Sequence, residues 1–276
     1  MTLPSGIYWS RDVYRATFFP IRSDGGIDVP GYPEPSAGGY GGLELQGPKN
    51  FTPNFGQARA VTNVSQGRVN DTMYLPSIDA KTAELHLSYF DQATFAELSG
   101  VKRRTIGGGT GMPLGTDKQG LEISGAFMIS HLKTQDDDGI QQWHNYLIPR
   151  CRAIVNIPGA NDEDYDIPVN MSLSSSRKHI WGQTLTELLD GATKMHAWDH
   201  VTWGRLNIWA WLTDGTEDLF LLPTDKPALD TFADTFTLWD YAAGTQITTG
   251  ITKSETGVDY LAAPASNKLL IAVYEY

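Results

Sequence analysis

The sequence predicts a mainly β protein, built from sandwich or barrel units and with few helices. Three observations support this fold class. The 276 residues include 28 glycines and 15 prolines, which indicates many turns and short elements. Short segments with alternating apolar and polar residues recur along the chain, whereas only two segments have the pattern of a helix. The hydrophobic content of 41% is enough for a substantial core.

The strands are predicted from this alternation. Residues 83–89 and 167–173 follow the two-residue period of a half-buried strand. Pro168 places the second of these at a sheet edge or at the start of its strand, because proline cannot donate to a ladder. Further short strands, each bounded by turn residues, are predicted at 146–148, 153–157, 206–212, 236–239, 247–249, 258–261 and 269–276.

Two short helices are predicted. The first covers 91–98, where Asp91 is the expected N-cap and Gly100 the stop signal. The second covers 184–189 and is closed by Gly191.

The order of these elements predicts two copies of one unit. Leu43-Glu44-Leu45-Gln46-Gly47 and Leu121-Glu122-Ile123-Ser124-Gly125 each precede a polar stretch, an alternating strand and a short helix. The predicted organisation is an N-terminal arm rich in turn formers, a first unit, a glycine-rich linker, a second unit and a C-terminal β segment that completes or decorates the barrel. These parts cover 1–42, 43–104, 105–120, 121–200 and 201–276.

Charge and cysteine content restrict the class of protein. The chain has 21 basic and 32 acidic residues, a net charge of −11, which opposes binding of nucleic acid through its phosphates but suits a channel that a polyanion must pass without sticking. Cys151 is the only cysteine, so an intrachain disulfide is impossible and a buried thiol is expected. No signal peptide or membrane span is predicted from the sequence.

No segment has a convincing catalytic or metal-binding pattern. The glycines at 107–111 lack the spacing and the Gly-Lys-Ser/Thr ending of phosphate loops. Asp136-Asp137-Asp138 lacks the alternate ligands of a calcium loop. His196 and His200 have metal-ligand spacing but no supporting glutamate, and the acidic residues at 162–166 cannot be paired from sequence alone. We therefore expect no enzyme activity, no metal and no cofactor.

Tryptophans cluster in the last third of the chain. In 206–212, Trp209 and Trp211 alternate with aliphatic residues, so both faces of the predicted strand are apolar. Such a strand is either buried on both faces or packed against a neighbouring subunit, and we expect one of these two outcomes. The alternative is a platform on which sugars stack.

Several segments resemble the major tail tube proteins of long-tailed bacteriophages. In the second half, these are the run WHNYLIPRCRA at 143–153 and the polar loop and strand that follow it. In the first half, the run PSIDA at 76–80 leads into a strand and a short helix, as in that family. The segments at 242–252 and 264–270 look like strand pairs of phage structural proteins.

The resemblance implies a structural role in the phage tail. Rings of such proteins stack into a tube in the virion, and double-stranded DNA passes through the lumen without specific binding. The rings contain either three chains of two units or six chains of one unit, and the internal repeat favours three. The expected partners are other copies of the chain and other tail proteins. Assembly follows synthesis in the host bacterial cytoplasm, without a membrane. The alternatives are a carbohydrate-binding or hydrolase module of a phage tip, or a head or decoration protein.

A long loop within 46–75 is the predicted contact between subunits. Its prolines and turn formers argue against a central strand, yet it contains Phe51 and Phe55. With Arg59, these are the candidate contact residues. The alternative is that both phenylalanines pack into their own barrel.

Overall fold

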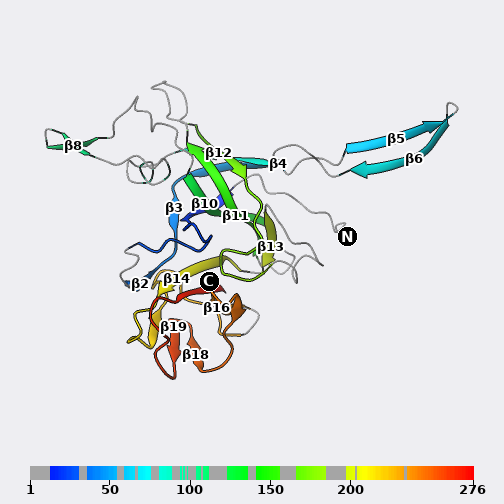
Figure 1. Cartoon of the computed structure of the whole chain (residues 1–276). Helices are drawn as coiled ribbons and strands as arrows, with labels where there is room; N and C mark the ends of the chain where they lie inside the picture. Colours follow the sequence, from blue (N-terminus) through cyan, green and yellow to red (C-terminus); the bar gives the residue numbers. More distant parts are fainter. Residues whose placement is uncertain are drawn as a thin grey trace.

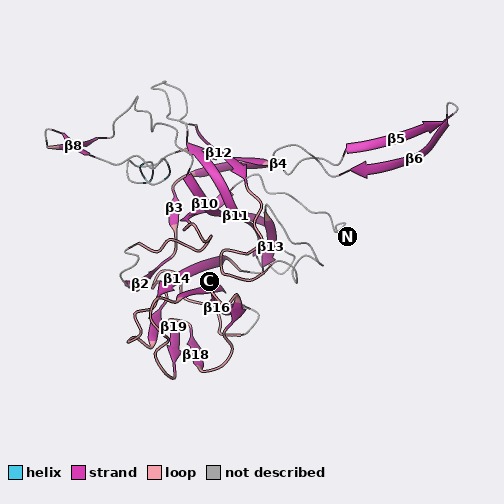
Figure 2. Ribbon diagram, in the orientation of Figure 1, coloured by secondary structure: helices cyan, strands magenta, loops and turns pink. Residues whose placement is uncertain are grey.

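The structure is a computed structural model. It describes residues 13–30, 36–54, 59–65, 68–75, 81–88, 94, 96, 98, 104–106, 108–111, 123–135, 141–155, 166–184, 197–202, 204–232 and 235–276. Strands dominate these residues (Figure 2), and only Thr94, Ala96 and Leu98 are helical. The mainly β class is therefore confirmed. No helix in the described residues is long and apolar enough to cross a membrane.

The largest sheet has eight antiparallel strands. Its order is β3-β1-β10-β11-β12-β7-β4, with β13 pairing with β11 outside this path. The strands are β1 (Val13–Pro20), β3 (Leu43–Leu45), β4 (Pro48–Asn54), β7 (Thr82–Leu87), β10 (Ile123–Gln135), β11 (Gln141–Val155), β12 (Ile167–Leu173) and β13 (Trp198–Thr202). The predicted strands 83–89 and 167–173 are confirmed as β7 and β12, which pair with each other. The two strands predicted at 146–148 and 153–157 are parts of one long strand, β11.

Two smaller sheets contain most of the C-terminal residues. One has the order β17-β16-β20-β14-β2 and the other β15-β19-β18. Their strands are β2 (Ser36–Tyr40), β14 (Leu206–Leu212), β15 (Leu219–Leu221), β16 (Phe236–Asp240), β17 (Thr245–Gln246), β18 (Ile251–Ser254), β19 (Gly257–Tyr260) and β20 (Leu269–Glu275). The predicted strands β14, β16, β19 and β20 are confirmed. The strand predicted at 247–249 is wrong, because the chain turns there into Gly250, whose φ is 72°.

Three apolar cores hold these sheets together. Strand β4, at one end of the large sheet, also contacts β1 near the other end, so this sheet curls around the first core. In β10, Phe127 and Ile129 face the first core, whereas Ala126 and Met128 face the second. The second core lies between the large sheet and the five-stranded sheet, and the third lies between the two smaller sheets. The body is therefore layered, as Figure 1 shows.

The predicted N-terminal arm contributes strands to two sheets. Its residues 13–20 form β1, which lies between β3 and β10, and its residues 36–40 form β2, which pairs with β14. Burial explains this difference from the prediction, because Phe18 and Phe19 are 1% and 0% exposed on opposite faces of β1. The turn formers at 24–26 do form a turn, where Gly25 has a φ of 88°.

The two predicted units are not separate among the described residues. Segment 43–98 contributes β3, β4 and β7 to the large sheet and also the separate strand pair β5–β6, whereas segment 121–188 contributes three successive strands, β10 to β12, to the large sheet. The predicted linker also differs, because β8 (Arg104–Ile106) pairs with β9 (Gly109–Gly111) in a hairpin. Thr184 forms an isolated bridge with Lys178, and the remaining residues of the second predicted helix lie outside the described residues.

Candidate functional site

A long β-hairpin leaves the body at β4 and returns at β7. Asn54 pairs with Thr82 where β4 and β7 end their ladder. Arg59 pairs with Leu75 at the start of a second ladder, formed by β5 (Arg59–Ser65) and β6 (Arg68–Leu75). The second ladder pairs residues that follow β4 with residues that precede β7, with its register offset by two residues from the first, so β5–β6 is the outer part of the same excursion of the chain. Figure 1 shows β5–β6 projecting well away from the sheets of the body.

The outer part of this hairpin contains apolar residues on both strands. Its cross-strand pairs include Val61 with Met73 and Val64 with Val69. In the described residues β5 and β6 form a two-stranded sheet, so each leaves one edge for another strand. An isolated two-stranded hairpin is at best marginally stable in water. A partner surface would stabilise it.

The structure changes the assignment of the predicted contact residues. Phe51 is not a contact residue, because it is 6% exposed and lies in the first core, with its ring 5.3 Å from that of Tyr146. Strand β4 is an edge strand, as its prolines require, but its inward face closes the body. Arg59 begins β5, and its side chain lies outside the described residues, as does Phe55. The hairpin beyond Asn54 therefore replaces Phe51 as the candidate contact.

Trp209 and Trp211 lie in the core between the smaller sheets. Trp211 is 1% exposed, and its indole nitrogen donates to the carbonyl of Leu221 at 3.1 Å. Trp209 packs against β2 so closely that a methyl group on Gly41 would lie 2.3 Å from the indole ring. Trp211 therefore has no exposed face on which a sugar could stack, and Trp209 is half-buried. Of the two expected outcomes, burial and packing against a neighbouring subunit, the chain by itself has β14 between two cores: Ile208 and Ala210 lie in the second and Trp211 in the third.

Only some of the residues considered as metal ligands or catalytic groups belong to the described part of the chain. His196, Asp136–Asp138 and 162–164 lie outside them, and His200 is described only as part of β13. Asp166 accepts a hydrogen bond from the Nδ1 atom of His86 at 2.9 Å on the sheet surface. The described side chains contain no group of three or more residues suited to hold a metal ion.

A buried polar cluster joins the large sheet to the five-stranded sheet. The guanidinium of Arg15 donates to the Asn207 side chain and to the Tyr276 hydroxyl, both at 3.1 Å. Its Nε atom lies 3.3 Å from Glu44, which also pairs with Lys226. Burial opposes ionisation of Glu44, but the hydrogen bond from Lys226 and the charge of Arg15 outweigh it and lower the pKa of this carboxyl. The cluster fixes how the two sheets are joined.

Comparison with protein-family models finds no match, and a search of curated proteins likewise finds none.

Proposed function

We propose that the chain is a structural protein that assembles with copies of itself into stacked rings, forming a phage tail tube through which DNA passes, and that it has no enzymatic activity. The observation that carries the proposal is the β4–β7 hairpin, whose outer part β5–β6 projects from the body (Figure 1). A subunit that builds rings needs such an element to reach a neighbour. The resemblance of 143–153 and 76–80 to tail tube proteins gives the class of assembly.

The physical case for assembly rests on the unpaired strands of this hairpin. A neighbouring copy that covers its apolar pairs would contribute about 1.5 to 3 kcal/mol for each large side chain buried. A strand added at a free edge would contribute backbone hydrogen bonds as well. The same contact recurs in every subunit of a ring or tube, so a modest gain per copy produces a stiff assembly.

The way the predicted repeat folds bears on how many chains we propose per ring. Three chains per ring require two similar units in each chain. In the large sheet, β3, β4 and β7 of 43–98 and β10 to β12 of 121–188 occupy different positions, and β5–β6 of 43–98 forms a separate strand pair with no described counterpart in 121–188. This arrangement supports six chains per ring, each contributing one unit with a C-terminal β extension.

Negative-stain electron microscopy of the purified protein tests the proposal. The full chain should form rings or tubes, whereas a variant in which 59–75 is replaced by a short Gly-Ser connection should remain dispersed. Because β4 and β7 still pair in this variant, circular dichroism and the melting temperature should show a folded body. Absence of rings and tubes from the unaltered chain would contradict the proposed function, and tubes from the shortened variant would contradict the role of the hairpin.

A further inference from the structure

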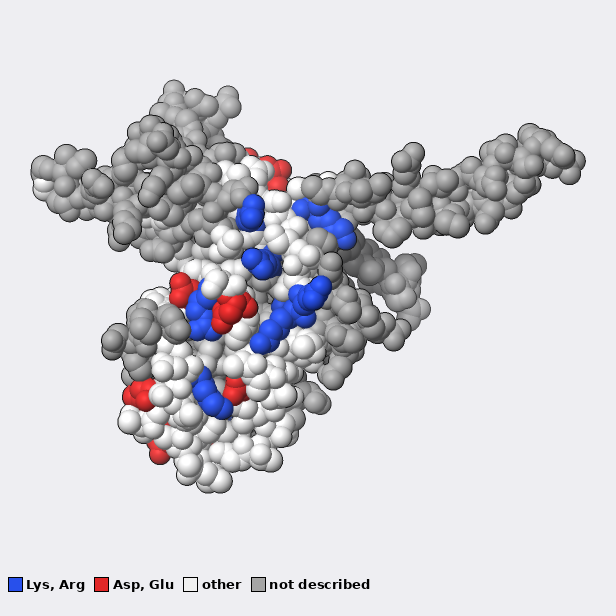
Figure 3. Space-filling model, viewed as in Figure 1, with Lys and Arg blue, Asp and Glu red and all other residues white. Residues whose placement is uncertain are grey.

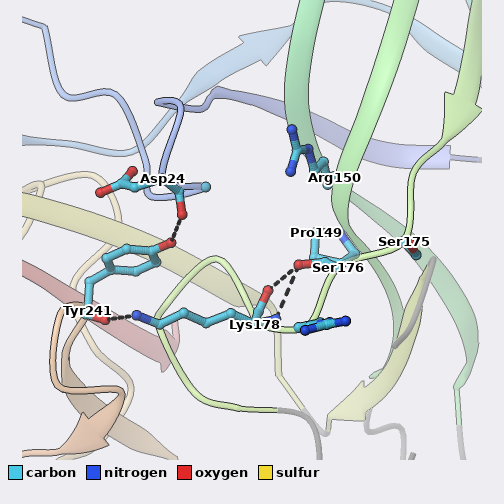
Figure 4. A pocket seen from close by; sticks show the side chains of 9 residues that line it. Asp24, Pro149, Arg150, Ser175, Ser176, Lys178 and Tyr241 are labelled. Carbon is cyan, nitrogen blue, oxygen red and sulfur yellow. Dashed lines mark hydrogen bonds between the residues drawn. The ribbon is translucent and has the colours of Figure 1, made fainter. Parts of the chain in front are cut away.

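An open groove lies where four separate segments of the body meet. It has a volume of about 450 Å³. The segments are the turn after β1, the middle of β11, the stretch after β12 and the turn after β16. The lining residues are Asp24, Gly25, Pro149, Arg150, Ser175, Ser176, Arg177, Lys178 and Tyr241. Figure 4 shows Arg150 reaching from β11 toward the Asp24 turn, with Tyr241 and Lys178 along the other side.

The groove carries a local excess of positive charge. Its cations are Arg150, Arg177 and Lys178, and its acidic residue is Asp24. The carboxylate of Asp24 is already held by Arg22 at 2.9 Å, so that charge is offset from outside the groove. On the face seen in Figure 3, Lys and Arg side chains gather over the central part of the body. This contrasts with the net charge of −11 for the whole chain.

The two arginines of the groove lack partners within the described residues. Both side chains are exposed, and neither guanidinium makes a hydrogen bond or ion pair there. By comparison, Arg15 is bonded in the buried cluster, and Arg205 lies over the ring of Tyr14 at 4.5 Å. A guanidinium presents a planar set of donors that matches a carboxylate or phosphate in two parallel hydrogen bonds. Arg150 and Arg177 are therefore available for an oxyanion.

The walls of the groove hold Lys178 in position. Lys178 donates from its amine to the backbone carbonyl of Tyr241 at 2.5 Å, and the same amine lies 4.0 Å from the centre of the Tyr241 ring. The Tyr241 hydroxyl donates to the carbonyl of Asp24 at 2.8 Å. Ser176 accepts from the Lys178 backbone amide and donates to its carbonyl. Tyr241 thus links the segment after β12 to the Asp24 turn, which favours a preformed backbone frame for the site.

We propose that this groove binds carboxylates of a second copy of the chain. The inference rests on the proposed self-assembly and names one of its contacts. Copies that each carry a charge of −11 repel one another on average, so a compact cationic groove is where an acidic neighbour is favoured. The run Asp136-Asp137-Asp138 supplies three successive carboxylates for three cations. It lies outside the described residues and is assigned by its charge alone, whereas the other acidic run ends in Asp166, which is bound by His86.

A nucleic acid is the weaker choice of occupant. The overall negative charge of the chain opposes approach of a long polyanion. The groove is also walled by Pro149 and Tyr241, and its volume of about 450 Å³ accommodates a few side chains, not a duplex.

The test is a binding titration that does not require tubes to form. A fluorescein-labelled peptide with the sequence of residues 133–141 is titrated with the full chain, and binding is followed by anisotropy. The double variant Arg150→Gln/Arg177→Gln should weaken peptide binding about tenfold or more. Arg152→Gln is the matched control, because Arg152 lies two residues further along the same strand, is exposed and does not line the groove; it should bind as the unaltered chain does.

Three outcomes would overturn the proposal: no binding of the peptide, equal weakening in the control, or displacement of the peptide by a short DNA duplex at lower concentration than by an unlabelled peptide. A peptide with asparagine at 136–138 should not compete. If tubes form but the peptide does not bind, the groove proposal fails and the tube proposal stands. If the peptide binds and no tubes form, the tube proposal fails and the groove still binds carboxylates.

Discussion

Acidification should destabilise the fold through His131. This residue is on β10, is 8% exposed and faces the first core. Its ring lies 6.1 Å from Phe51 and 5.9 Å from Tyr146, and it pairs across the strands with His144. Burial and, to a smaller extent, the charge of His144 lower the pKa of His131 from its ordinary value of 6.5 to about 4.

The sign and size of the effect follow from this pKa. The unfolded chain takes up a proton on this histidine below about pH 6.5, whereas the folded chain does so only near pH 4. Stability is therefore complete above pH 6.5 and falls as the pH drops toward 4. The difference between the two pKa values corresponds to about 3 kcal/mol in the free energy of unfolding. About 2.5 kcal/mol of this is lost by pH 4.5.

Urea unfolding at several pH values checks this prediction. The free energy of unfolding of the unaltered chain should fall between pH 7.5 and 4.5 by about 2.5 kcal/mol more than that of His131→Phe, which cannot titrate. His131→Gln, which is polar and also cannot titrate, should show the same flatter dependence, so packing effects are separated from protonation. Parallel pH dependences for all three proteins would refute the reasoning.

Three further outcomes are expected from the packing. Gly41→Ala should lower the free energy of unfolding by about 1 to 3 kcal/mol, because its methyl group would lie 2.3 Å from the indole ring of Trp209. Gly38→Ala, whose methyl group would have no atom within 4 Å, should leave the free energy of unfolding and the melting temperature nearly unchanged. Arg15→Met should lower the free energy of unfolding by about 1 to 3 kcal/mol, since it leaves the buried side-chain oxygen of Asn207 without its donor, while Arg22→Met, which breaks a surface pair, should lower it by under about 1 kcal/mol. Burial raises the pKa of the Cys151 thiol, so a thiol reagent should label it only when urea unfolds the chain; rapid labelling of the native protein would contradict its buried position.

Local sequence patterns were sufficient to predict the class of fold and several strands. Strand β12 has the predicted bounds, 167–173, because its alternation of apolar and polar residues reports burial on one face. Strand β14 was also predicted, since apolar residues on both faces indicate two packed layers. Turn residues were less decisive: the glycines after residue 106 suggested a linker, yet they form part of the β8–β9 hairpin.

The candidate site depended on contacts that no local pattern contains. The predicted loop at 46–75 was the correct region for a projecting element, but Phe51 points into its own core, because the curled sheet brings β4 against β10 and β11. The sequence alone could not distinguish a Phe51 ring buried in its own core from one exposed for contact with another subunit.

The cationic groove also could not be predicted from the sequence. Arg150 was part of a run used for resemblance, while Arg177 and Lys178 had no distinguishing sequence context. These residues meet Asp24 and Tyr241 only because β11, the stretch after β12 and two distant turns converge in the folded chain. Alternation along a strand depends on neighbours in sequence and is therefore readable from it. A binding groove depends on long-range packing that brings separate segments together, and only the tertiary structure decides that.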